Sequence, residues 1–159
     1  MSVRTKKHEG FRSRPYKDTR GKWTVGYGFN LQEPHVAKVV PNAVKLGLRD
    51  LTTQEADAIY APLYAKAQLD AQMYAGKAWN QLDPVRQEAL TDMSYQLGGP
   101  KLAKFKNMNA ALQKGDYVRA YQEALNNDYA KQVPRRAREN AKLIMLGSLA
   151  IPKSTGVSK

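Results

Sequence analysis

The chain has 159 residues, of which 42% are hydrophobic and 25% are charged, so we expect a single globular domain that buries about two thirds of its unfolded surface. It has no cysteine, which excludes a disulfide framework, and no apolar run approaches the ~20 residues of a membrane span. Its formal net charge of +12 predicts attraction to an anionic partner, which could be a phosphate-rich envelope, an acidic polymer or nucleic acid.

The basic residues gather in two stretches of the chain. Eight of them fall within the first 22 residues, and the second group comprises Lys131, Arg135, Arg136, Arg138 and Lys142. Neither stretch shows a recognisable nucleic-acid-binding motif, so that function is an alternative suggested by charge alone. The N-terminus is polar and lacks the apolar segment of a signal peptide, so we expect synthesis in the cytoplasm and release by some other means.

Residues 2–9 form the first predicted helix, which Gly10 ends because glycine enters the left-handed region at little cost. The helix is polar, with Val3 as its one apolar side chain, and it places Glu9 at its end. Asp18 to Gly21 then predicts a reverse turn between two extended segments. Eight residues separate Glu9 from Asp18, and five separate Asp18 from Thr24.

The segment after this turn, residues 23–29, alternates bulky and small side chains. A period of two predicts a strand with its bulky residues on one face. Thr24 would then lie on the other face, which Gly26 and Gly28 leave open. An open strand face beside a carboxylate is suited to an extended substrate.

The pattern of the remaining residues predicts mainly helices. Pro34 and Pro41 exclude a long helix before residue 50, and Thr52 to Glu55 is a capping box for a helix that runs towards Tyr74, with a kink or break at Pro62. Further helices are predicted over residues 84–97, 102–112, 117–125 and 134–147, with a frayed tail over 148–159.

This pattern resembles the phage-type lysozymes, glycoside hydrolase family 24. That family places Glu at the end of its first helix, Asp and Thr on a following hairpin, and Gly-x-Gly after the Thr, as Glu9, Asp18, Thr24 and Gly26-Tyr27-Gly28 do here. The resemblance implies an α+β, mainly α, lysozyme-like fold. Its small lobe with a short β-hairpin or sheet would cover residues 1–51, a long connecting helix 52–75 and a larger helical lobe 76–147.

A second block, residues 82–98, is similar to the central helix of the same family, where an aromatic-Gln pair lines the cleft. That pair would be Tyr95 and Gln96 here. Residues 132–138 resemble the Pro-x-Arg segment whose Arg approaches the catalytic Glu, which makes Arg136 the matching residue. One departure is Phe29, where many members have His. The resemblance therefore implies that Glu9, Asp18 and Thr24 are catalytic. It also implies that the other matched residues bind substrate: Gly26, Gly28, Tyr95, Gln96 and Arg136.

The same resemblance implies a bacteriolytic muramidase without a cofactor, which cuts peptidoglycan between N-acetylmuramic acid and N-acetylglucosamine. Glu9 would be the general acid, while Asp18 and Thr24 would position water for inversion, which needs a carboxyl separation of about 6.5–9.5 Å. A lytic transglycosylase is the enzymatic alternative, because it needs the Glu but no water. We expect a monomer made in the host bacterial cytoplasm that reaches the periplasm through a membrane lesion. With two histidines and no cysteine, a metal site is not expected.

Overall fold

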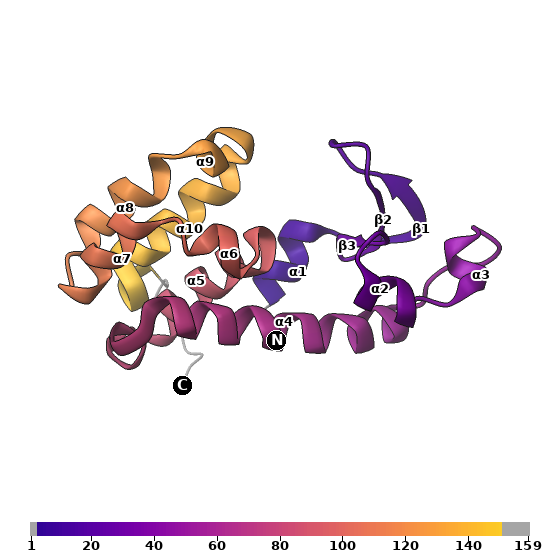
Figure 1. Cartoon of the computed structure of the whole chain (residues 1–159), viewed down its shortest axis with the longest axis horizontal. Coiled ribbons are helices and arrows are strands. Elements are labelled where there is room, and N and C mark those ends of the chain that lie inside the picture. Colours follow the sequence, from indigo (N-terminus) through magenta and orange to yellow (C-terminus); the bar gives the residue numbers. More distant parts are fainter. Residues whose placement is uncertain (1–2, 151–159) are drawn as a thin grey trace, which may run out of the picture. The chain divides into compact units, whose positions relative to one another are not determined.

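The structure, a computed structural model, describes residues 3–150 and divides the chain into two compact units, residues 1–65 and 66–159. Figure 1 shows that helices predominate and that the strands all lie in the N-terminal part of the chain. The mainly α, α+β lysozyme-like fold expected from the sequence is therefore confirmed.

The first unit opens with α1 (Val3–Glu9), followed by strands β1 (Arg12–Lys17), β2 (Trp23–Gly26) and β3 (Phe29–Asn30). The three strands form an antiparallel sheet in the order β1-β2-β3. The predicted reverse turn at Asp18 is present, because Gly21 N–H donates to the Asp18 carbonyl at 2.9 Å. The sheet thus begins three residues after Glu9 and carries Asp18 at the tip of its first hairpin.

The expected single strand over residues 23–29 is wrong in one respect. The chain turns at Gly26, Tyr27 and Gly28, and Phe29 returns to pair with Val25. Both glycines adopt positive φ, +68° and +74°, which a β-branched or bulky residue would resist. The alternation does hold within β2, so Val25 and Phe29 share the buried face of the sheet.

Two short helices follow the sheet: α2 (Pro34–Val39) lies against β3, and α3 (Asn42–Lys45) lies against β1. Proline stands at the first position of α2 and at the N-cap of α3, where a missing N–H costs nothing. The core of this unit combines the sheet with these helices and the start of α4, and comprises Val25, Phe29, Val36, Val40, Val44, Leu51, Ala56 and Tyr60.

Helix α4 (Thr53–Ala75) begins at the predicted capping box. Glu55 N–H donates to Thr52 Oγ1 at 3.1 Å, and Thr52 N–H donates to Glu55 Oε1 at 3.0 Å. Arg49 also pairs with Glu55, and this hydrogen bond together with the capping contacts lowers the pKa of Glu55 to about 2. Helix α4 continues through Pro62, so the alternative of a break there is wrong, while the alternative of a kink stays a prediction.

The second unit contains the rest of α4 and a set of mostly short helices: η1 (Gly76–Gln81), α5 (Pro84–Leu97), α6 (Gly99–Leu102), α7 (Lys106–Gln113), α8 (Tyr117–Leu125), α9 (Asp128–Gln132), α10 (Pro134–Leu146) and η2 (Gly147–Ala150). Asp83 and Asp116 cap α5 and α8 as predicted, each accepting a backbone N–H three residues on. The helix expected over 102–112 is divided at residues 103–105, and the sequence pattern gave no sign of η1 or α9.

Part of the expected frayed tail is ordered, since residues 148–150 belong to η2. Ser148 donates from its N–H and its hydroxyl to Asp83 Oδ2, both at 2.9 Å. Arg86 binds the carbonyls of Ile144 and Met145 and lies 3.6 Å over the ring of Tyr117. These contacts fix the end of α10 against the start of α5; residues 151–159 lie outside the described part of the chain.

A buried ion pair crosses the core of the second unit. The Arg136 guanidinium, on α10, donates to both carboxylate oxygens of Asp92, on α5, at 2.9 Å. Asn140 also donates to Asp92 at 2.8 Å, and all three side chains are buried. Arg136 therefore belongs to the interior and not to a solvated basic face.

We expect Arg136→Leu to lower the free energy of unfolding by about 3–5 kcal/mol, because it leaves the Asp92 carboxylate buried without its cation. Urea denaturation followed by circular dichroism measures this loss. Arg138→Leu removes an exposed arginine from the same helix and should change stability little. Equal stability of the two variants would contradict a structural role for the ion pair.

Candidate active site

Glu9 ends α1, and its position follows from the local backbone. Gly10 takes φ of +71° and donates its N–H to the Lys6 carbonyl at 2.9 Å, which closes the last turn of the helix as predicted. The Glu9 side chain is then directed at the turn between β2 and β3. A Cβ built on Gly28 would lie 2.2 Å from Glu9 Oε1, so the carboxyl group occupies the space that a side chain at residue 28 would need.

Gly26 is required for a different reason. A Cβ there would lie 2.7 Å from the Phe29 ring and 3.0 Å from Leu51 Cδ2, so Gly26 makes room for the core of the first unit. Gly28 makes room for Glu9. Direct contact of either glycine with a substrate remains a prediction.

Helix α1 is held in place by a cluster of polar and aromatic side chains. Lys6 Nζ donates to Asp57 Oδ1 on α4 at 2.8 Å and lies over the rings of Tyr27 and Tyr60, at 5.2 and 5.3 Å from their centroids. The Tyr27 hydroxyl donates to the same Asp57 oxygen at 3.1 Å. The Lys6 hydrogen bond, followed by that of Tyr27, holds the pKa of Asp57 below its usual range.

Contacts from this cluster stabilise α1, which is short and polar, and so hold the candidate residue Glu9 in position. The same cluster includes Tyr27, which lies between the two glycines of the turn, so it ties α1, the turn and α4 together.

Asp18 stands at the tip of the β1-β2 hairpin. Its Oδ1 accepts the backbone N–H groups of Arg20 at 2.8 Å and Lys22 at 2.9 Å. The hydrogen bond from Lys22, which outweighs the desolvation, lowers the pKa of Asp18, and the Arg20 bond adds to this. Asp18 is therefore ionised at neutral pH, the state that a base acting on water requires.

Thr24 lies on β2, opposite Tyr16 of β1 and Asn30 of β3. The expectation that its face is open is wrong, because Thr24 is only 4% exposed and its hydroxyl donates to the Lys22 carbonyl at 2.9 Å. The neighbouring strands flank it on both sides, which a count of glycines along one strand could not show. The oxygen of this hydroxyl keeps lone pairs that can accept a hydrogen bond.

Tyr16 is a residue that the sequence patterns missed. It pairs with Thr24, and cross-strand partners project from the same face of a sheet. Burial raises the pKa of Tyr16, the Arg12 guanidinium lowers it, and the charges of Glu9 and Asp18 both raise it further. Tyr16 therefore lies within electrostatic reach of both carboxyl groups. Its spacing of two from Asp18 was the signal available in the sequence.

The remaining predicted site residues lie in the second unit. Tyr95 and Gln96 stand near the end of α5, and Gln96 Oε1 is buried with no hydrogen-bond partner among residues 3–150. A buried acceptor without a donor is costly and marks a position that a ligand donor would satisfy. Arg136 is committed to Asp92, as described above, and substrate contact by any of these three remains a prediction.

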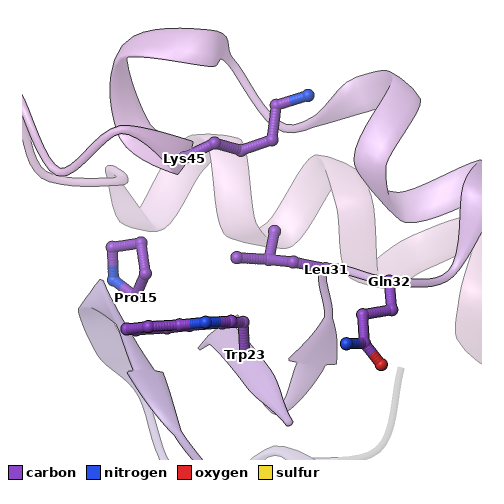
Figure 2. Close-up of a pocket in the computed structure, with 5 residues that line it drawn as sticks. All are labelled: Pro15, Trp23, Leu31, Gln32 and Lys45. Carbon is purple, nitrogen blue, oxygen red and sulfur yellow. The ribbon is translucent and has the colours of Figure 1, made fainter.

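The other face of the sheet carries a cavity of about 310 Å³. It lies beside the Trp23 ring and is lined by Pro15, Trp23, Leu31, Gln32 and Lys45 (Figure 2). Trp23 pairs with Lys17, one residue out of phase with Thr24 and Tyr16, so this cavity lies on the face away from them. It is therefore separate from the group that contains Thr24.

Within residues 3–150, no cluster of three or more His, Cys, Asp or Glu side chains is placed to hold a metal ion. No helix in that range has the length and apolar character needed to cross a membrane.

The mainly α fold with its small antiparallel sheet is consistent with a glycoside hydrolase of the lysozyme type. The sequence model of the family described as Phage lysozyme matches residues 6–139, and the chain belongs to that family.

Three relatives are consistent with this assignment. The chain is 27% identical over 161 residues to the pre-baseplate central spike protein Gp5 of Enterobacteria phage T4, covering 94% of this chain but only 28% of the spike protein. It is 24% identical over 154 residues to the probable T4-type lysozymes 2 and 1 of Dictyostelium discoideum, covering 89% of this chain and 91% of each of theirs.

We expect Gly28→Ala to abolish most activity, because the new Cβ would displace the Glu9 carboxyl group as well as strain the backbone. Gly47→Ala is the matched control: Gly47 has the same φ of +74°, lies in the same unit, and a Cβ there meets nothing within 4 Å. Both variants should lose similar stability, on the order of 1 kcal/mol. Equal activity of the two variants on a wall suspension would contradict the contact between Gly28 and Glu9.

Proposed function

We propose that this protein is a muramidase that hydrolyses the β-1,4 bond between N-acetylmuramic acid and N-acetylglucosamine in bacterial peptidoglycan. The observation that carries the proposal is the setting of Glu9. Its carboxyl group is held against Gly28, in the same unit as an ionised Asp18 and in electrostatic reach of the strand face that carries Thr24 and Tyr16.

The chemistry assigns a different role to each carboxyl group. Cleavage of a glycosidic bond needs a proton for the leaving oxygen and a base for the attacking water. Glu9 is the general acid, since it is partly buried at the end of α1. Asp18, with its lowered pKa, is the base that takes a proton from water, and the water attacks the face of the sugar opposite the leaving group.

Thr24 assists this step by accepting a hydrogen bond from the water. Its own hydroxyl hydrogen is directed to the Lys22 carbonyl, which leaves the oxygen free to act as an acceptor. The resulting product has inverted configuration at the anomeric carbon. Relatives named as T4-type lysozymes support this substrate class.

We expect Glu9→Gln to remove wall lysis by at least about 100-fold without unfolding the protein, since the amide keeps the shape and cannot give up a proton. Digestion of purified peptidoglycan, with mass analysis of the fragments, measures the loss. Full activity of the folded variant would contradict the assignment of Glu9.

Asp18→Asn tests the role of water. For an inverting hydrolase we expect a similarly large loss, because the amide cannot accept the proton. In the parent enzyme, the rate should persist in acid until the pH falls below the usual pKa range of an Asp, since the pKa of Asp18 is lowered and the base is lost only on its protonation. Normal rates for Asp18→Asn, with anhydro-muramoyl ends in the products, would instead establish a lytic transglycosylase.

The net charge fits an anionic bacterial envelope as the place of action. Lys6 and Arg136 do not suit a test of this idea, because Lys6 is paired with Asp57 and Arg136 is buried. Lys131, Arg135 and Arg138 are exposed and are therefore the better choice.

We expect lysis of whole, outer-membrane-permeabilised cells to fall steeply with salt, because the Debye length is only about 10 Å at 0.1 M. Cleavage of a short neutral oligosaccharide should change little. Replacing Lys131, Arg135 and Arg138 by Gln should flatten the first dependence and leave the second unchanged. The same salt dependence for both substrates would exclude long-range attraction as the use of this charge.

A further inference from the structure

We propose that Tyr16 is a positioning residue of the reaction, whose hydroxyl donates a hydrogen bond to the attacking water beside Thr24 and Asp18. The inference rests on the proposed hydrolysis and adds a residue to it. The family resemblance, which was carried by Glu9, Asp18, Thr24 and the two glycines, gives this tyrosine no role.

The register of the sheet places the phenol on the required face. Tyr16 and Thr24 are direct cross-strand partners, so their side chains project together. Asp18 follows Tyr16 by two residues, and the ladder continues that far because Asp18 N–H donates to the Lys22 carbonyl at 2.9 Å. Alternation along β1 therefore brings Tyr16, Asp18 and Thr24 to one face.

The orientation of the Tyr16 ring is set by Arg12. The Arg12 guanidinium carbon lies 4.1 Å from the ring centroid, a close cation–π contact. A bulge in β1 between Arg12 and Tyr16 changes the local register, which lets both side chains lie together. The ring thus lies between its strand neighbours and a cation.

The Tyr16 hydroxyl is also in the protonated state that a hydrogen-bond donor requires. Burial and the charges of Glu9 and Asp18 raise its pKa, against the opposing effect of Arg12, so it keeps its proton at neutral pH. A neutral hydroxyl can donate a hydrogen bond, which neither an ionised Asp18 nor the already committed Thr24 hydrogen can do.

With Tyr16 as the donor, each hydrogen-bonding group of the attacking water has a partner. Water gives one proton to Asp18 and forms its bond to the anomeric carbon, while that carbon's bond to the leaving oxygen breaks and Glu9 protonates the oxygen. Tyr16 keeps its proton throughout. The Tyr16 hydroxyl donates to one lone pair of the water oxygen, and Thr24 accepts the second hydrogen of the water. The other lone pair of the water oxygen then faces the anomeric carbon.

Tyr16→Phe tests the proposal because it removes the hydroxyl and keeps the ring for Arg12. We expect kcat on a soluble peptidoglycan oligosaccharide to fall about 10- to 100-fold, with KM within about 2-fold and an unchanged melting temperature. Tyr117→Phe is the matched control, since Tyr117 is likewise stacked under an arginine, Arg86, at 3.6 Å in the second unit. It should leave kcat unchanged.

A second measurement separates positioning from packing. Site-specific replacement of Tyr16 by 3,5-difluorotyrosine keeps the shape and makes the hydroxyl more acidic. We expect kcat relative to the parent enzyme to fall at a pH where the fluorinated ring is ionised and the parent ring is not, because the phenolate no longer donates; a packing role would leave this ratio unchanged. The charged groups that act on this hydroxyl are Arg12, Glu9 and Asp18, and none of them is changed.

The outcomes are distinguishable from failure of the proposed hydrolysis. If Glu9→Gln is inactive and Tyr16→Phe keeps full kcat, the inference about Tyr16 is wrong and the muramidase proposal stands. A raised KM at unchanged kcat would also overturn it, since the hydroxyl would then bind sugar and not water. If Glu9→Gln remains active, the proposed hydrolysis itself fails.

Discussion

The close approach of Glu9 to Gly28 is the constraint on which the candidate active site depends. A carboxyl group can occupy this space only if residue 28 has no side chain, and the backbone there has a φ that favours glycine. The approach also requires α1 to be held still, although seven residues of polar helix have little stability of their own. The cluster of Lys6, Asp57 and Tyr27 provides that support from α4 and from the turn itself.

This arrangement joins three segments that lie far apart in the sequence. Asp57 accepts from α1 and from the turn with one carboxylate oxygen, so a single side chain on α4 fixes the helix that carries Glu9 and the glycine that faces it. Tyr27 adds ring contacts to Phe11, Phe29 and Tyr60, which connect the turn to the core of the first unit. The position of Glu9 is therefore a property of the whole unit.

The small sheet separates two environments because its side chains alternate. One face carries Tyr16 and Thr24, and the other carries the core residues Val25 and Phe29, with Trp23 and its cavity beyond them. Trp23 is 47% exposed and lies under the Lys17 ammonium, 5.5 Å from its ring, so the outer end of the core face is open to solvent. The proposed catalytic residues and the packing residues are thus separated within a few positions of the chain.

The charge of the protein is also divided between two uses. Lys6 and Arg136 count towards the +12, yet each is engaged with a carboxylate, Lys6 with Asp57 and Arg136 with the fully buried Asp92. Asp57 and Asp92 are counted among the 14 acidic residues, so these two neutral pairs leave the net charge of +12 unchanged. The pairs do decide which cations are available for direct contact with an anionic partner.

The sequence by itself determined the helices with strong end signals, the hairpin turn at Asp18 and the order of Glu9, Asp18 and Thr24, because these follow from local backbone preferences and short spacings. Capping by Thr52, Asp83 and Asp116 needed only residues three positions apart. The burial of Thr24, the support of α1 by Asp57 and the pairing of Arg136 with Asp92 were decided by the tertiary structure. Each depends on side chains from separate elements, 44 residues apart for the buried pair, and no local pattern records such a contact. The same is true of Tyr16, whose neighbours became visible only when β1 and β2 were in register.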